Sequence, residues 1–426
     1  MNLKKIKLSS LFIILNTFVL FTSVLFIEEI YKLQFSESEY FKNQALSNRQ
    51  KVEVIEAKRG SILDREFNEV SETINAFNIG IYPEKIDDKK LVSELLAPLL
   101  QLDKAVIFER LNNNKNYFYL KRNIDFETGT KIKNWNYKGI NVEKSSKRII
   151  YSDSLTQIIG HVDPDGNGIE GLELYFDNSL KGTDGELRYE AAPNGDFIPQ
   201  GKSSILDPVH GEDLILSIDS ELQYISEDLC SEALQITQAF KCSVVFMNAE
   251  NGEIIISAEK SSINNKYFDI NLISGRALYE PGSALKIFTV GALLQNDEVN
   301  ENDTYYVEDK IEIIEESCNK NYEGLKGCFR DFLKHDPYEL TVKEIIERSS
   351  NVGTIKITQN SNVLEIENFL IKFGFGEKTG VELTGETRGG FIDNKRCVTC
   401  LSSLSIGYSV NVSQYQMVRA YSIIAN

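Results

Sequence analysis

The feature that most constrains this fold is an apolar stretch from Tyr279 to Gln295, with the sequence YEPGSALKIFTVGALLQ. Pro281 and Gly282 interrupt the backbone, and the residues after them place apolar side chains on every side of a helix. A helix that is apolar on all faces is a buried helix. The stretch therefore predicts a helix at the centre of a domain.

This helix also carries two residues that could take part in a reaction. Ser283 begins it and Lys286 follows, so both side chains lie on one face with Cβ atoms about 5–6 Å apart. Because burial removes the water that stabilises an ammonium ion, the pKa of Lys286 should fall. A neutral amine beside a hydroxyl is a general base beside a nucleophile, and a helix N-terminus favours an oxyanion. The pair predicts an enzyme that forms an acyl-serine.

The S-x-x-K pattern alone is weak evidence, because it occurs three times in the chain. Two copies do not begin a continuous apolar helix: Ser257 with Lys260, and Ser317 with Lys320. The alternative interpretation of the copy at Ser283 is a capping serine followed by a lysine that reaches the surface.

A second apolar run lies near the N-terminus, from Leu11 to Ile27, and carries no charge. With Leu8 to Ser10 it approaches the roughly 20 residues that span a bilayer. Three lysines precede it, which predicts that residues 1–10 lie in the cytoplasm. A cleaved signal peptide is the alternative, but no A-x-A-like site follows the run. We expect an uncleaved single-pass anchor over residues 11–27 in the inner membrane, with the body of the chain in the periplasm.

Charge and cysteine content exclude some classes of function. A net charge of −17, from 46 basic and 63 acidic residues, argues against a nucleic-acid partner. The six cysteines can pair in an oxidising compartment, and the local candidates are Cys318 with Cys328 and Cys397 with Cys400. The C-V-T-C of the second pair also suggests a zinc or redox site, but no second pair of ligands is evident. We expect no metal and no cofactor.

The body of the chain divides near Asp207. Residues 28–58 have helical spacing, and RGSILDR from Arg59 to Arg65 predicts a tight turn that enters a strand. Short β-like and helical runs then alternate as far as residue 206, which is typical of an α+β fold. We predict a pedestal or dimerisation domain over residues 28–206 and a catalytic domain over residues 207–426.

One loop of the pedestal resembles a calcium site. Residues 163–167 place oxygen-bearing side chains at alternate positions between glycines. Pro164 and the glycine positions break the EF-hand spacing, so ordered turns around a short helix are the simpler interpretation.

A second chemical element is VKEIIERSSNVGTIKI, residues 342–357, which places Ser349 and Asn351 between two helices. S-x-N also occurs at Ser262 and at Ser409, so the pattern gains weight only from its place in the chain after Lys286. A hydroxyl there can pass a proton between the lysine and a leaving amine, and an amide can bind a peptide backbone.

Six stretches, taken together and in this order, resemble the class B penicillin-binding proteins, which are peptidoglycan D,D-transpeptidases, and in particular their septal, division-specific type. They are RGSILDR, GIEGLELYFDNSLKG, EPGSALK, SSNVG, FGFGEKTGVELTGE and SIGYSVNVSQYQMVRAYSIIAN. The resemblance implies that Ser283 is the acylated nucleophile, Lys286 its base, Ser349 the proton relay and Asn351 a contact to the substrate amide.

The same resemblance implies a serine β-lactamase-like catalytic domain, with an antiparallel sheet flanked by helices. It implies cross-linking of peptidoglycan stem peptides, acylation by β-lactams, and a membrane glycan polymerase and division proteins as partners. Three alternatives stay open. They are a lateral-wall elongation transpeptidase, a β-lactamase or β-lactam sensor, and a non-catalytic scaffold for wall synthesis.

The third motif of this family is K-T-G, and Lys378 to Gly380 contain these letters. In the family the motif lies on an edge strand downstream of a stretch similar to GYSVNVSQYQMVRAY, whereas this copy lies upstream of it. We therefore exclude it from the predicted site. We expect the catalytic domain to be C-terminally incomplete, without that strand, and the chain as given to be poorly folded or weakly acylated.

Overall fold

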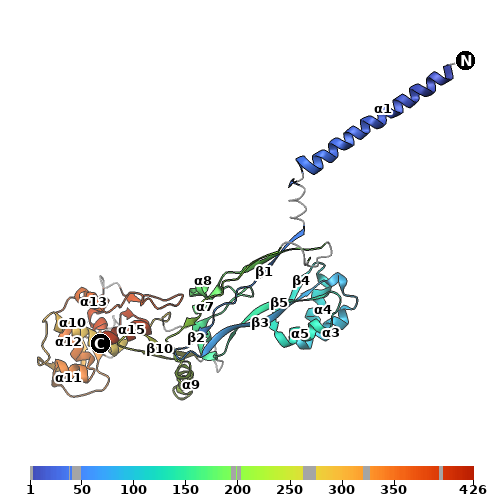
Figure 1. The fold of residues 1–426 in the computed structure, drawn as a ribbon. Coiled ribbons are helices and arrows are strands. Elements are labelled where there is room, and N and C mark those ends of the chain that lie inside the picture. Colours follow the sequence, from blue (N-terminus) through green and yellow to red (C-terminus); the bar gives the residue numbers. More distant parts are fainter. Residues whose placement is uncertain are drawn as a thin grey trace. The chain divides into compact units, whose positions relative to one another are not determined.

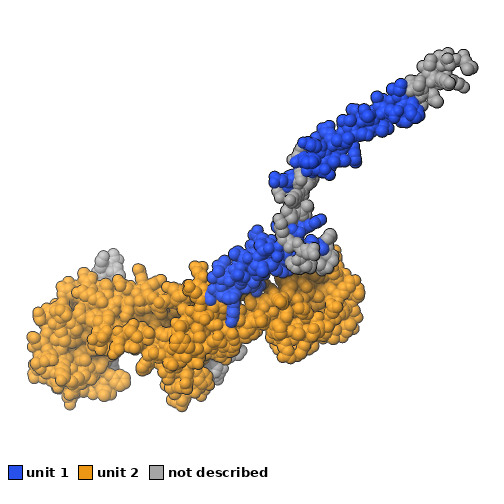
Figure 2. Space-filling model, viewed as in Figure 1, with its two compact units in different colours: residues 1–58, 182–211 blue, residues 59–181, 212–426 orange. Residues whose placement is uncertain are grey.

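The computed structural model describes residues 3–37, 39–40, 49–192, 198, 203–261, 275–319, 327–392 and 397–426. These residues form two compact units, each assembled from separate stretches of the chain (Figure 2). The first unit comprises Met1–Lys58 and Gly182–Gly211, and the second comprises Arg59–Lys181 and Glu212–Asn426.

The first unit begins with the long helix α1, Leu3–Tyr31, which continues into the π-helical turn η1, Lys32–Ser36 (Figure 1). By length and composition, Phe12–Phe35 is apolar enough to cross a membrane. The side chains from Phe12 to Phe35 are exposed, because no part of the described chain covers them. This helix fits the anchor predicted from the sequence.

The remainder of the first unit is a small antiparallel sheet of three strands in the order β1-β6-β7. They are β1 (Gln50–Ile55), β6 (Gly185–Glu190) and β7 (Ser203–Leu206). The helical spacing that we read over residues 28–58 was therefore wrong for Gln50–Ile55, because pairing with β6 along its whole length makes this segment a strand.

The second unit contains a five-stranded sheet built on the long strand β3, Glu69–Ile81. Strand β3 pairs with β2 (Ile62–Leu63), β4 (Phe118–Asp125) and β5 (Ile140–Ile150), and β8 (Leu214–Ile215) pairs with β2 in parallel. Three helices lie beside this sheet in Figure 1: α3 (Lys89–Leu100), α4 (Lys104–Asn113) and α5 (Phe126–Asn134). Leu96, Ile107 and Ile132 from these helices join Ile79 and Ile81 of β3 in one apolar core.

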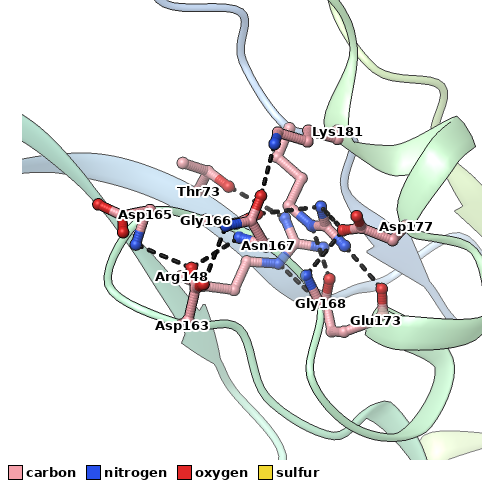
Figure 3. A network of polar contacts seen from close by, with 11 residues as sticks. Thr73, Arg148, Asp163, Asp165, Gly166, Asn167, Gly168, Glu173, Asp177 and Lys181 are labelled. Carbon is pink, nitrogen blue, oxygen red and sulfur yellow. Dashed lines mark hydrogen bonds and ion pairs between the residues drawn. The ribbon is translucent and has the colours of Figure 1, made fainter.

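Short helices follow β5, and they carry the glycine-rich stretch of the sequence. They are the 3₁₀ turn η3 (Asp153–Leu155), α6 (Thr156–Ile159), α7 (Gly171–Tyr175) and α8 (Asp177–Lys181), and a further 3₁₀ turn, η2 (Pro83–Lys85), follows β3. Here Arg59 contacts residues more than 100 positions later in the chain: its guanidinium lies 2.7 Å from Glu173 and 2.7 Å from Asp177. Arg148 contacts the other oxygen of Glu173 at 2.6 Å (Figure 3). The RGSILDR and GIEGLE stretches are thus joined by a buried ion-pair network.

The C-terminal part of this unit begins with α9 (Ser220–Thr237) and the antiparallel hairpin of β9 (Lys241–Met247) and β10 (Ile254–Ser261). Gly252 adopts a positive φ in the turn that connects the two strands. Helix α15 (Gln414–Ala425) packs against β9, with Gln414 donating to the Ser243 carbonyl at 3.2 Å. The α+β class, with an antiparallel sheet flanked by helices, is confirmed.

The remaining elements surround the predicted site. They are η4 (Gly282–Leu285), α10 (Lys286–Gln295), α11 (Val342–Glu347), α12 (Asn351–Thr358), α13 (Val363–Lys372) and α14 (Cys400–Ser405). Three short antiparallel pairs connect them: β11 (Thr304–Val307) with β14 (Tyr338–Thr341), β12 (Lys310–Glu312) with β13 (Cys328–Arg330), and β15 (Gly390–Phe391) with β16 (Val410–Asn411).

Candidate active site

The apolar stretch forms a helix, but not from Ser283 onward as the sequence suggested. Ser283 is exposed in the 3₁₀ turn η4, and regular α-helix begins at Lys286. The prediction of burial on all faces was also too broad. Leu285, Phe288 and Leu293 are buried, whereas Ile287 and Leu294 are 37% and 41% exposed, and these two line an apolar cleft of about 430 Å³.

Two hydrogen bonds with residues near the C-terminus hold the turn that carries Ser283. Gly282 donates its N–H to the Gly407 carbonyl at 2.9 Å, and the Tyr421 hydroxyl donates to the Ala284 carbonyl at 2.8 Å. Both glycines have positive φ, +57° at Gly282 and +86° at Gly407. A Cβ on Gly407 would lie 1.9 Å from the Gly282 oxygen, so only glycine permits this approach. The GYSVNV stretch thus supports the turn that presents Ser283.

Lys286 is buried, with 2% of its surface exposed, and its ammonium group points to the S-S-N turn. Its Nζ donates to the Ser349 carbonyl at 2.5 Å and lies 3.3 Å from Ser349 Oγ. Burial lowers the pKa of Lys286 to about 8, and the nearby Asp331 carboxylate opposes that shift. The structure therefore brings Lys286 and Ser349 together with the proton affinity that a general base needs near neutral pH.

Ser349 follows α11 in a left-handed conformation, with φ of +53°, which few non-glycine residues adopt. This conformation ends α11 and leaves Ser349 exposed, while the next residue, Ser350, caps α12. Asn351 opens α12 and donates Nδ2 to the Arg330 carbonyl at 2.8 Å. The Lys286 backbone N–H donates to the Ser283 carbonyl. Among the described residues, however, no hydrogen bond joins the Ser283 hydroxyl to Lys286 Nζ, whose partners are the carbonyl and hydroxyl of Ser349.

Sequence reasoning missed Asp331, which lies in a stretch that reads as a polar insertion. Its carboxylate accepts from Ser350 Oγ at 2.8 Å and from the Val352 N–H at 2.9 Å. His335 Nε2 lies 3.2 Å from the same carboxylate. The only available signal was an aspartate upstream of the S-S-N turn, and nothing in its spacing predicts the contact.

The other copies of the motifs lie in different surroundings. Ser257 and Lys260 lie on β10, where residues three apart face opposite sides, and Ser257 bonds the buried Tyr415 hydroxyl. Thr379 and Gly380 lie in a turn whose N–H groups donate to the Glu386 carboxylate, at 2.7 and 3.2 Å. The copies that involve Ser262 and Lys320 fall outside the described residues.

Three disulfides link cysteines of the second unit, and two of them are the predicted local pairs, Cys318–Cys328 and Cys397–Cys400. The third, Cys230–Cys242, joins α9 to β9 and was not predicted. C-V-T-C is therefore a disulfide in this structure.

The loop that resembled a calcium site is held by its own backbone. Asp163 accepts N–H groups from Asp165 and Asn167 at 2.9 Å each, and accepts from the Asn167 side chain at 2.9 Å. These bonds use both carboxylate oxygens for the turn, and they hold the pKa of Asp163 below its usual value.

Two family models match the chain. The penicillin-binding protein dimerisation domain matches residues 54–216, and the penicillin binding protein transpeptidase domain matches residues 242–426. The two matches overlie the five-stranded sheet and the region around Ser283, respectively.

Individual relatives agree with the family models. The chain is 30% identical over 387 residues to the peptidoglycan D,D-transpeptidase FtsI of Buchnera aphidicola, covering 87% of this chain and 65% of that protein. It is 26% identical over 446 residues to the penicillin-binding protein PbpB of Mycobacterium tuberculosis, covering 96% and 63%. The chain thus spans less than two thirds of the length of these two relatives.

Among solved structures, the fold is similar to that of PBP2 from Helicobacter pylori, determined in a complex with MreC. The TM-score is 0.70, with 22% identity, and the match covers 88% of this chain and 77% of that one. At this identity the similarity establishes the fold alone.

Proposed function

Since the chain belongs to the class B penicillin-binding proteins, we propose that it is a serine D,D-transpeptidase that cross-links peptidoglycan stem peptides through an acyl-serine. The observation that supports this most directly is Lys286, which is 2% exposed, has a pKa of about 8, and contacts Ser349 one turn after Ser283. A buried amine of this kind has few structural uses, because an ion pair or a solvent-exposed position would satisfy it at lower cost.

In the proposed first step, Ser283 Oγ attacks the carbonyl carbon of the penultimate D-Ala of a stem peptide. Neutral Lys286 accepts the serine proton, and Ser349 passes a proton to the nitrogen of the last D-Ala. The peptide C–N bond breaks, an ester to Ser283 forms, and the last D-Ala leaves as a free amine.

In the second step, the amine of a neighbouring stem attacks this ester. The new amide bond forms, the C–O bond to Ser283 breaks, and the proton lost by the attacking amine returns to the serine oxygen through Ser349 and Lys286. Asn351 is proposed to bind the backbone of the donor stem. Its Nδ2 is bonded to the Arg330 carbonyl, which orients its side-chain oxygen as an acceptor for a substrate N–H.

The proposal extends to the organisation of the chain. We assign residues 1–10 to a cytoplasmic tail, 11–27 to an inner-membrane anchor, 28–206 to the pedestal and 207–426 to the periplasmic transpeptidase domain. The stretch from Gly168 to Leu180 resembles the septal members of the family, so we place the protein at the division septum, beside a membrane glycan polymerase and division proteins. Localisation of a tagged protein along the side wall would favour the elongation alternative.

The test is covalent labelling by a fluorescent penicillin, followed by mass spectrometry of the modified peptide. We expect the chain extended through a downstream K-T-G strand, which is the parent protein of all these tests, to be labelled on Ser283. Its Ser283→Ala variant should be unlabelled although it folds as the parent does. Labelling of the Ser283→Ala protein would show that Ser283 is not the acylated nucleophile.

The same preparation separates the alternatives. Rapid release of hydrolysed penicillin, with many turnovers per protein, would favour a β-lactamase. If Ser283→Ala supported division as well as the parent does, the scaffold function would be correct instead.

A further inference from the structure

The S-S-N turn, residues 349–351, and the start of α12 are hydrogen-bonded to a segment that the proposed mechanism does not use. This segment is the end of strand β13, Arg330, and the residue that follows it, Asp331. The Arg330 carbonyl accepts from Asn351 at 2.8 Å, and the two oxygens of Asp331 accept from Ser350 Oγ and the Val352 N–H at 2.8 and 2.9 Å. Three consecutive residues, from Ser350 to Val352, are therefore bonded to two residues at the end of β13.

Asp331 is itself held rigidly. Its side chain is 9% exposed, its N–H donates to the Asp309 carbonyl at 3.1 Å, and its carboxylate faces His335 at 3.2 Å. The Cys318–Cys328 disulfide closes the β12–β13 hairpin three residues before it. A carboxylate that is this well supported can fix the groups bonded to it.

We propose that Asp331 is the positioning residue of this site, and that its carboxylate fixes the first turn of α12 so that Ser349 stays beside Lys286 and Asn351 keeps its bond to the Arg330 carbonyl. The inference rests on the proposed function. Asp331 acts through Ser350 and Val352 rather than on the substrate. Ser349 itself is held by a bond from its N–H to the Ile346 carbonyl at 3.0 Å and by the contacts with Lys286, and its backbone is strained. Loss of the Asp331 bonds to the next residues therefore allows Ser349 to move away from the amine.

The same carboxylate has a second, electrostatic effect. Asp331 is the charge that raises the pKa of Lys286 against its burial. Among the described residues, the His335 ring also faces Asp331, and its pKa is raised, first by its bond to the Asp336 carbonyl and further by Asp331 and Asp309. Removing the Asp331 charge must therefore shift the titration of Lys286 to lower pH, which a purely structural residue would not do.

The test measures the rate of acylation by a fluorescent penicillin between pH 6 and pH 10, together with thermal unfolding. Asp331→Ala removes both bonds, and we expect its plateau rate to fall by about 10–100-fold. Asp331→Asn keeps the shape and loses the charge, and we expect the midpoint of its pH profile to move below that of the parent.

Two controls complete the design. Asp336→Asn removes the same charge from a side chain with no bond to the turn, and should keep the parental rate and midpoint. His335→Gln should keep the midpoint of the pH profile, because that midpoint reports the titration of Lys286. A pH profile of His335→Gln without this midpoint would overturn the inference.

The outcomes are distinct. A folded Asp331→Ala protein that is acylated at the parental rate overturns the positioning role. If Asp331→Ala does not fold, the Asp331→Asn profile decides, and an unchanged midpoint overturns the inference. A parent that no penicillin labels rejects the proposed function itself, whereas a labelled parent with unaltered variants rejects only the role of Asp331.

Discussion

Lys286 and Ser349 come from separate parts of the sequence, and each has a strained or costly environment. Lys286 loses most of its hydration, and Ser349 adopts a left-handed backbone. Such features tend to cluster at sites of chemistry, because the surrounding fold must offset their cost. The pair is therefore the place where single substitutions are most informative.

The first prediction concerns pH. Because burial lowers the pKa of Lys286 to about 8, the amine is mostly protonated below pH 8 and cannot accept the serine proton. We expect acylation to rise about tenfold per pH unit up to a midpoint near 8 and then to level off. Stopped-flow or gel-based labelling rates across this range measure it.

Substitution of the base provides the control for this profile. Lys286→Arg keeps the positive charge but cannot deprotonate in this range, so its acylation should be lost at every pH. Lys343→Arg, at an exposed position on α11, should leave the profile unchanged. A profile in Lys286→Arg that matches the parent would show that another group is the base.

The second prediction concerns Gly407. Alanine there would place Cβ 1.9 Å from the Gly282 oxygen, so the turn that presents Ser283 must move. We expect the acylation rate of Gly407→Ala to fall by about 10–100-fold, as a displaced reacting group does. Penicillin labelling of purified protein measures it.

Gly380→Ala is the matched control. Gly380 has nearly the same φ, +84°, but a Cβ there would have no described atom within 4 Å beyond its chain neighbours, so the change introduces backbone strain without a clash. It should cost about 1–2 kcal/mol of stability and leave acylation unaffected. Loss of labelling in Gly380→Ala would indicate that Lys378 to Gly380 belong to the active site after all.

Among helices and strands, local sequence patterns predicted contacts between residues close in the sequence, but not contacts that depend on tertiary packing. The apolar period located α10, and close cysteine spacing predicted Cys318–Cys328 and Cys397–Cys400. Cys230–Cys242 was missed because a helix end and a turn separate the two, so their contact depends on how α9 packs on β9. Asp331 was missed for the same reason: its partners are set by tertiary packing of a hairpin against α12.

The third prediction concerns the ion-pair network in Figure 3, which joins β5 to α7 and to the RGSILDR turn. Glu173 is fully buried and balances both Arg59 and Arg148. Glu173→Gln leaves two buried guanidinium groups without their shared counter-charge, so we expect the free energy of unfolding to fall by about 3–5 kcal/mol. Urea-induced unfolding measures this loss.

An exposed ion pair in the same unit serves as the comparison. Glu127→Gln removes the charge that faces Lys131 on the surface of α5, where water screens the interaction. Its stability should match that of the parent. Equal stability of Glu173→Gln and Glu127→Gln would mean that the network is no stronger than a surface pair.

For the whole molecule, the decisive segment is α1. Its side chains from Phe12 onward pack against no other part of the described chain, so its removal should not disturb the second unit. A protein without residues 1–35 should move from the membrane fraction to the soluble fraction while penicillin still labels Ser283. Sedimentation followed by labelling of both fractions measures this, and a shortened protein that still sediments with membranes would show that another surface binds them.

The interleaving of the two units along the chain has a consequence for biosynthesis. Strand β2 gains its parallel partner β8 only after a long interval, since Ser61 meets Asp213 across 152 residues, and β1 likewise waits for β6. At 5–20 residues per second, ribosomes need roughly 8–30 s to supply that partner. During this time the early strands have unpaired edges, which favour association with other chains. We therefore expect the nascent polypeptide to need holding factors from the synthesis of Ile62 until Leu214 has emerged.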